Sequence, residues 1–236
     1  MVRFARYSIV LAGLLVLSAA GCRESSTPER FPRKSDADAK SGERPFNHSG
    51  EESDNPPVVQ PEEPPPPPTI PKVVMSDELR ATCLVNVDDT IPEAELADLD
   101  GKPSELGSLF GPKLTVLCFW TIGTTPRSQL VANAVLQDLM KDVVGPFGEQ
   151  GVRVVAINVG DGVEDVKKYV ADAKATFPNL LDPQGEYFTK IATERKMPRT
   201  YLLDAEGKVL WFDMEYSNTA RRDLVQGIEV ALDEMK

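Results

Sequence analysis

The sequence contains a single histidine, His48, and it lies in a segment rich in proline and charged residues. A domain formed by the rest of the chain has no imidazole, which excludes a histidine general base and most histidine metal sites. We therefore expect neither a metal nor a cofactor. Basic residues are also outnumbered by acidic ones, with a formal net charge of -11. Because phosphate binding needs a basic face, we expect no nucleic-acid partner.

No apolar run near the N-terminus is long enough to cross a membrane as a helix. The run at 9–17 is shorter than the roughly 20 residues that such a helix needs. Arg3 and Arg6 precede it, and small residues follow at 19–21. This order is typical of a secretory signal peptide, here residues 1–21. A buried core helix is the alternative interpretation of the run.

Cysteine is rare, with Cys22, Cys83 and Cys118 as the three examples. The residues before Cys22 read L-S-A-A-G and resemble the lipobox of bacterial lipoproteins, although Ala19 stands where leucine is commonest. The resemblance implies that Cys22 becomes the lipidated first residue of an envelope protein, with its domain on the periplasmic or extracytoplasmic side. Each buried acyl methylene would add ~0.8 kcal/mol to this membrane anchor. An ordinary secreted protein is the alternative.

The state of the other two thiols is left open by the sequence. In an oxidising compartment Cys83 and Cys118 could pair. They could equally be small buried hydrophobic residues, and the strand context of Cys118 favours burial. A disulfide needs Cα atoms within ~7 Å, a separation that spacing along the chain does not define.

Residues 22–78 have the composition of a tether. Large apolar residues are few, charges of both signs alternate, and five prolines follow one another at 64–68. Such a segment cannot bury enough apolar surface to offset its conformational entropy, so we expect disorder. The proline run should form a polyproline II spacer of ~3.1 Å per residue. A docking site for a proline-recognising partner is the alternative.

Residues 79–236 have the patterns of a globular α/β domain. Continuous apolar runs rich in strand formers indicate strands buried on both faces, and the intervening segments have helical spacing. The segment at 104–110 is expected to form a helical turn, and Leu130 is expected on the buried side of the first long helix. The expected strands are 84–87, Leu114–Trp120, Val152–Val159 and a hairpin of 201–204 with 209–212; the expected helices are 127–144, 163–174 and 220–235.

Four short segments of this domain resemble the thioredoxin superfamily, most closely its TlpA-like and redoxin (AhpC/TSA-related) members of bacterial envelopes. They are the L-D-G-K turn at 99–102, the strand at 116–120, the segment M-P-R-T-Y-L-L-D at 197–204 and the turn at 205–209. The resemblance covers nearly all of residues 84–236. It implies an α/β, thioredoxin-like fold in which helices flank a central mixed sheet, with an N-terminal β extension.

The chain departs from that family at the redox motif. The family reads F-W-A-T-W-C-P-P-C-R, and here the two cysteines are replaced by Thr124 and Arg127 in the sequence T-T-P-R. The peroxiredoxin motif T-x-x-C also lacks its cysteine at Thr124. Threonine cannot form a mixed disulfide, and it has no histidine base, so we expect no catalytic residue here. Thr124 or Thr125 is instead expected to cap the following helix. Arg127 could bind an anion or a carboxylate, or it could be solvated.

Pro198 occupies the family position of a cis-proline that faces the active site. If the Met197–Pro198 bond is cis, the backbone of Met197 could pair with an extended peptide, or the turn could serve the fold alone. The sequence thus predicts a redox-inactive binding or scaffold module that acts on an extended peptide or an envelope protein. The alternatives are an oxidoreductase that uses Cys83, Cys118 or a partner protein, and a structural spacer.

Overall fold

The computed structural model describes residues 67–236. The predicted signal peptide, the lipidation at Cys22, His48 and most of the tether fall outside the described residues. Within residues 67–236, no helix is long and apolar enough to cross a membrane.

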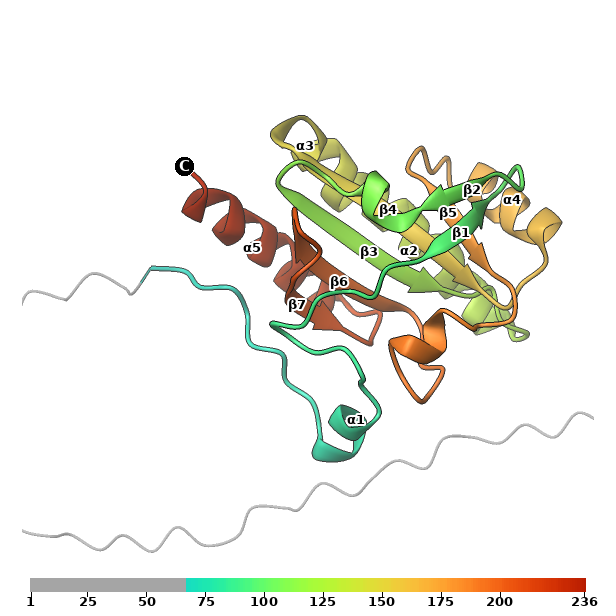
Figure 1. Cartoon of the computed structure of the whole chain (residues 1–236), viewed down its shortest axis with the longest axis horizontal. Coiled ribbons are helices and arrows are strands. Elements are labelled where there is room, and N and C mark those ends of the chain that lie inside the picture. The colour runs from blue at the N-terminus through green and yellow to red at the C-terminus, as the bar shows by residue number, and fades with distance from the viewer. Residues whose placement is uncertain (1–66) are drawn as a thin grey trace, which may run out of the picture. The chain divides into compact units, whose positions relative to one another are not determined.

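The core of the structure is a mixed sheet of seven strands in the order β2-β1-β5-β4-β3-β6-β7 (Figure 1). The central strands β3 and β4 run parallel, with Leu114 opposite Val152 and Trp120 opposite Asn158. β5 extends the parallel part, whereas β6, β7 and β1 join antiparallel. The strands are β1 (Glu95–Asp98), β2 (Pro103–Glu105), β3 (Leu114–Trp120), β4 (Val152–Val159), β5 (Asn179–Asp182), β6 (Arg199–Asp204) and β7 (Val209–Asp213).

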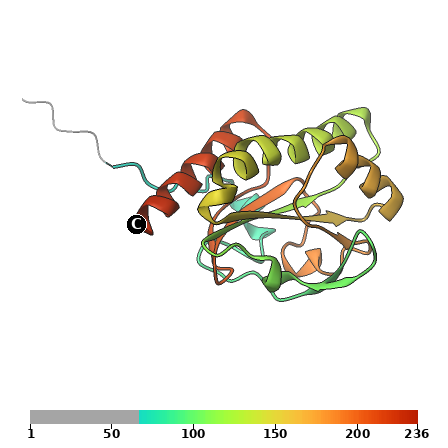
Figure 2. The ribbon, with the colours of Figure 1, turned by 90° about the horizontal axis from the view of Figure 1, so that it is seen from above.

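The long helices cover one face of the sheet, as the edge-on view in Figure 2 shows. This face packs on α2 (Pro126–Leu139), α4 (Val163–Asp172) and α5 (Asn218–Glu234). A π-helical turn (Met140–Val144) and the short α3 (Gly145–Phe147) continue α2. The other face packs on the segment before β1 and on two 3-10 turns, Leu106–Leu109 and Phe188–Lys190.

Side chains of β3 alternate between two hydrophobic clusters, one on each face. Cys118 and Trp120 belong to the cluster under α2 and α5, and Leu117 and Phe119 belong to the opposite cluster. Every residue of β3 is buried. A strand enclosed on both faces reads as a continuous apolar run, and this is why the sequence predicted β3 and β4 with their observed limits.

Two expectations about local structure were wrong, and a third was confirmed only in part. Residues 84–87 form no strand, because the amides of Leu84 and Val85 both donate to the Ile191 carbonyl, at 2.9 and 3.2 Å, and no ladder continues from there. The N-terminal β extension is the β1–β2 hairpin instead. The helical turn expected at 104–110 is present as the 3-10 turn Leu106–Leu109, but the segment begins within β2. Leu130 is 74% exposed, because the buried side of α2 passes through Ala132, Val135, Leu136 and Leu139.

The chain packs against the domain before residue 79, where the predicted tether was expected to end. The Gln226 side chain donates to the Thr69 carbonyl at 3.0 Å, and Ile70 and Val73 pack on the cluster under α5. Ser76 then caps α1 (Asp77–Ala81). Apolar residues at 70 and 73 are too sparse to predict this contact, since they contact the domain only once the tertiary fold has formed.

Candidate functional site

The site where the family carries its redox cysteines lies between the end of β3 and the start of α2. Thr125 is the N-cap of α2, and Pro126 is its first residue. The Thr125 hydroxyl accepts from the Ser128 amide at 3.1 Å, and the Ser128 hydroxyl accepts from the Thr125 amide at 3.1 Å. This reciprocal capping box satisfies backbone groups that the helix leaves free. Thr124 and Arg127 are both exposed beside it.

The capping box also explains the glycine at 123, where the family motif has tryptophan. Gly123 has φ +68°, and a Cβ at this position would lie 2.5 Å from the Ser128 hydroxyl oxygen. A side chain at 123 would therefore displace the Ser128 hydroxyl from the cap. Glycine at 123 thus leaves room for a helix start that is capped by two hydroxyl groups and contains no cysteine.

Asp161 holds the loop from the neighbouring strand end. Its Oδ2 accepts from the Thr121 hydroxyl at 3.0 Å, the Ile122 amide at 2.7 Å and the Asn158 side-chain amide at 2.9 Å. Asp161 was not predicted from the sequence. The signal was present, because Asp161 follows β4 as Thr121 follows β3, and the carboxyl ends of parallel strands meet at one edge of a sheet.

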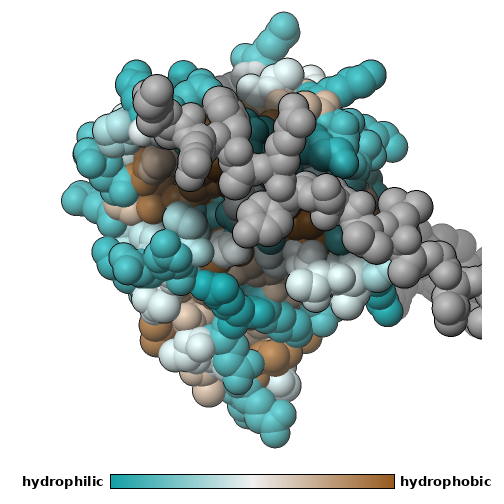
Figure 3. Space-filling view, turned by 90° about the vertical axis from the view of Figure 1, so that its right-hand side faces the viewer, coloured by the Kyte–Doolittle hydropathy of each residue, from teal (hydrophilic) through white to brown (hydrophobic). Residues whose placement is uncertain are grey.

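Arg127 and Pro198 come together at one hollow of about 250 Å³ beside the start of α2. Its wall also includes Trp120 and Val131, and the Met197–Pro198 peptide bond is cis. Thr124 is not among the lining residues. The indole Nε1 of Trp120 is buried and has no hydrogen-bond partner among the described residues. Figure 3, which faces the side toward which β3 runs in Figure 1, shows small hydrophobic areas between hydrophilic side chains.

A second, mainly apolar hollow shares Pro198 and Val135 with the first, and its lining also includes four acidic side chains and Arg221. Arg221 forms ion pairs with Asp138 at 2.9 Å and with Asp142 at 2.7 Å. The Tyr216 hydroxyl donates to Asp138, and burial together with this carboxylate raises the pKa of Tyr216 to about 12. Burial also raises the pKa of Asp213, which lines the same hollow.

The two cysteines of the domain are free and lie on opposite faces of the sheet. This excludes the disulfide that the sequence left open. Cys118 is fully buried, and burial raises its pKa to about 12, although the Thr200 hydroxyl donates to its sulfur at 3.6 Å. At neutral pH Cys118 is therefore a protonated core residue and a poor nucleophile.

The two hollows are better suited to binding a partner than to catalysing a reaction. No cysteine lines either hollow. Among residues 67–236, no group of three or more Cys, Asp or Glu side chains is placed to hold a metal ion. What remains at the site is a capped helix start, an apolar hollow with one guanidinium at its rim, and an adjoining hollow in which Arg221 pairs with Asp138 and Asp142.

Comparison with known proteins gives a consistent family. The profile of the AhpC/TSA family matches residues 87–212. The thiol-disulfide oxidoreductase ResA of Geobacillus thermodenitrificans is 30% identical over 125 residues, which are 53% of this chain and 67% of that protein. ResA of Bacillus subtilis is 30% identical over 119 residues, which are 50% of this chain and 62% of that protein. The match thus spans about two thirds of these relatives.

Solved structures show the same fold at low identity. A Bacteroides thetaiotaomicron protein superposes with a TM-score of 0.56 at 24% identity, over 64% of this chain and 93% of that one. The peroxidoxin BcpB of Mycobacterium tuberculosis gives a TM-score of 0.50 at 24% identity, over 64% of this chain and 99% of that one. The thioredoxin-like fold predicted from the sequence is therefore confirmed.

Proposed function

The chain belongs to the AhpC/TSA family, and we propose that it is a lipid-anchored envelope protein that binds a partner peptide and carries out no thiol–disulfide exchange. The observation that carries the proposal is the site at the start of α2. There Thr124 and Arg127 stand in place of both cysteines, while the hollow between Arg127 and Pro198 is retained.

The loss of exchange follows from the chemistry of the reaction. Thiol–disulfide exchange needs a thiolate that attacks a disulfide sulfur, and a second thiol that resolves the mixed disulfide. Neither Thr124 nor Arg127 can take these parts. Cys118 is buried beneath α2 in its protonated form. Because both sulfurs are absent from the site, we expect no turnover rather than a lowered rate.

Peptide binding is supported by the shape and charge around Pro198. The hollow on one side has an apolar wall that includes Val131 and Met197, and the hollow on the other side is lined by Asp138, Asp142, Asp213 and Glu215. An extended segment that lies across Pro198 would place apolar side chains in the first hollow. A lysine or arginine next to them would then face Asp213, since Arg221 already pairs with Asp138 and Asp142, and Lys196 pairs with Glu215.

The membrane anchor is proposed from the lipobox alone. Acylated Cys22 would insert into the membrane, and the proline-rich segment would hold the domain away from the lipid surface. A binding domain in this position could hold an envelope protein near the membrane. The partner and the anchor are separate parts of the proposal, and each has its own test.

Peptide binding is tested by filling the hollow beside Arg127 and Pro198 with a larger side chain. We expect the full chain to bind members of a library of extended peptides that combine apolar and basic residues, measured by fluorescence anisotropy. Val131→Trp, at the wall of the hollow, should abolish this binding. Leu130→Trp is the matched control, because Leu130 is the adjacent residue and is exposed outside the hollow. Equal binding by both variants, or no binding by the wild type, would refute the proposal that a peptide binds in this hollow.

A further inference from the structure

Arg127 is an unpaired cation at the end of a helix that disfavours cations. It is the second residue of α2, and its exposed side chain lines the hollow beside Pro198. No Asp or Glu among residues 67–236 forms an ion pair with it. The positive end of the helix dipole lies at this terminus, so a cation in the first turn is unfavourable unless an anion lies beside it. Arg127 therefore offers its donors to an anion that this part of the chain does not supply.

The same hollow contains a second donor without an acceptor. Trp120 belongs to the wall and is 1% exposed, and its buried indole Nε1 has no hydrogen-bond partner within the described part of the chain. A buried N–H group that lacks an acceptor has lost its hydration without compensation. Among the described residues that line the hollow, Arg127 is the one that carries a charge. The donors thus favour a ligand with an oxygen-bearing anion.

The remaining wall asks for an apolar group close to that anion. Val131, Val135 and Met197 line the hollow together with Pro198. In an extended peptide successive side chains point to opposite sides, so an Asp or Glu next to an apolar residue turns away from the surface that the apolar residue contacts. The last residue of a peptide has its carboxylate on the main chain, and its side chain can be apolar. One C-terminal residue therefore supplies both groups at one place.

We propose that this hollow binds the C-terminal carboxylate of a partner peptide whose last side chain is apolar. The inference rests on the peptide binding proposed above and adds which end of the peptide is bound. The carboxylate accepts hydrogen bonds from the Arg127 guanidinium, whose planar shape suits two parallel bonds to one carboxylate. The last side chain packs on Val131 and Met197.

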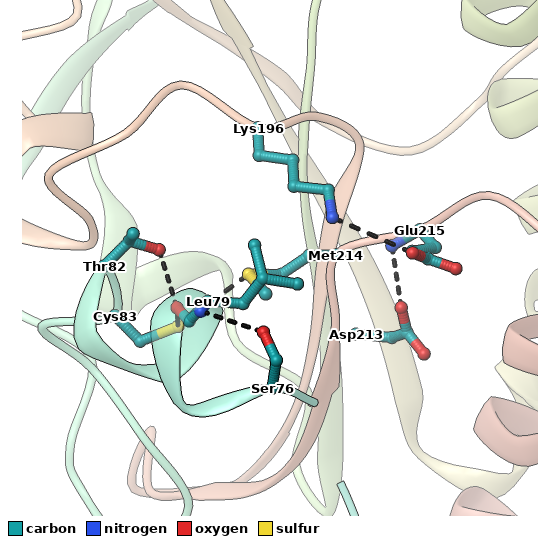
Figure 4. Close-up of polar contacts among 8 residues, drawn as sticks. All are labelled: Ser76, Leu79, Thr82, Cys83, Lys196, Asp213, Met214 and Glu215. Atoms are coloured by element: carbon teal, nitrogen blue, oxygen red, sulfur yellow. Dashed lines mark hydrogen bonds and ion pairs between the residues drawn. The ribbon is translucent and has the colours of Figure 1, made fainter. Parts of the chain in front are cut away.

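Asp213 adds a preference for a basic residue before the C-terminus. In Figure 4 the Lys196 side chain reaches Glu215, with which it forms an ion pair at 3.7 Å, and Asp213 accepts from the Glu215 amide at 2.7 Å. No lysine or arginine among residues 67–236 forms an ion pair with Asp213. Asp213 lines the second hollow, which shares Pro198 with the first. A lysine upstream in the peptide would supply the missing partner.

The test compares two forms of one peptide on the full chain. A fluorescein-labelled hexapeptide with a lysine upstream of a C-terminal leucine is made as the free acid and as the C-terminal amide, and binding is measured by anisotropy. We expect the amide to bind about tenfold more weakly or worse, because it lacks the charge that Arg127 pairs with. The protein has a net charge of -11 and repels the free acid as a whole, so a preference for the acid reports a local cation.

Two arginine variants assign the preference to its residue. Arg127→Gln should lower the affinity for the free acid to about that for the amide. The substitution removes an exposed side chain that forms no ion pair among the described residues, so we expect the protein to fold. Arg222→Gln is the matched control, since Arg222 is 72% exposed and lines neither hollow. It should retain the preference for the free acid.

The outcomes separate this inference from peptide binding itself. Equal affinity of the wild type for acid and amide would overturn the C-terminal assignment and leave peptide binding in place. Arg127→Gln protein that keeps the preference would do the same. So would equally tight binding of an amidated peptide in which a glutamate follows the leucine, because a side-chain carboxylate would then suffice. Binding of neither form would refute the proposed peptide binding together with this inference.

Discussion

The Thr125 and Ser128 side chains cap each other at the start of α2, with both N–H to hydroxyl distances at 3.1 Å. The box occupies the turn in which the family places its first redox cysteine, and it leaves Thr124 one residue before the N-cap. A hydroxyl-capped helix start is stable without an anion. A thiolate in the same turn would depend on the free amides of the helix for its stabilisation.

Restoring both sulfurs should restore part of the family reaction. We expect the wild-type chain to match the buffer blank in a dithiol-driven insulin reduction assay, because no thiolate is present at the site. Thr124→Cys with Arg127→Cys should show turnover above the blank, since Pro126 already occupies the third position of the family's C-P-P-C motif. Thr124→Ser with Arg127→Ser is the control without sulfur. Wild-type turnover that Cys118→Ala abolishes would show that a displaced thiol is active.

Removing the cap should weaken the domain by a modest amount. Thr125→Ala leaves the Ser128 amide without its acceptor, and we expect a loss of about 1 kcal/mol in the free energy of unfolding. Urea denaturation followed by tryptophan fluorescence measures this. Thr124→Ala changes an exposed neighbour that takes no part in the box and should stay within about 0.5 kcal/mol of the wild type. A larger effect at 124 than at 125 would contradict the observed cap.

Asp161 should be needed to hold the loop between β3 and α2. Asp161→Asn keeps the size of the side chain but removes the charge that accepts three hydrogen bonds on one oxygen. We expect the free energy of unfolding to fall by about 1–3 kcal/mol. Glu164→Gln is the control, because the Glu164 side chain is 85% exposed and its ion pair with Lys167 is long at 3.7 Å. Equal stability of both variants would show that the network contributes nothing.

Cys118 should make stability depend on pH in the alkaline range. Its pKa is raised to about 12 in the folded protein, so the folded state holds the proton more tightly than the unfolded chain, whose thiol has a pKa of ~8.5. This stabilisation is fully present below pH ~8.5 and is lost as the pH rises toward 12, by at most ~1.4 kcal/mol per pH unit.

Calorimetry of the wild type and Cys118→Ala isolates this effect, because the tyrosines that also titrate are common to both proteins. The wild type should be the more stable protein at neutral pH, since the thiol fills its place in the core. The difference should then narrow between pH ~8.5 and ~10. A difference that stays constant over this range would mean that Cys118 is not shielded from water.

The membrane anchor is tested independently of the domain. Cys22→Ser should release the protein from the membrane fraction into the soluble fraction or the medium, because no acyl chain can then be attached. Cell fractionation and immunoblotting measure the distribution. Cys83→Ser is the matched control and should remain with the membrane. Equal retention of Cys22→Ser would show that the lipobox interpretation is wrong.

The sequence by itself determined the central elements of this fold and the loss of the redox motif. β3 and β4 are buried on both faces, so each is an unbroken apolar run whose ends are visible. The replacement of two cysteines by Thr124 and Arg127 is likewise a property of single positions. By contrast, β5 has four residues with polar ends, and β1 and β2 are only partly buried, so their patterns are too short to predict.

Only the tertiary structure decided what each residue faces. Side chains alternate along a strand, so sequence alone cannot say which layer covers which set. Packing placed Cys118 under the helices and Cys83 beneath α1, which prevents their pairing. It also buried Arg199 beside a thiol more than a hundred positions away and brought Arg127 to Pro198. These contacts depend on strand order and on the layers that cover the sheet, and both form only when distant segments of the chain pack together.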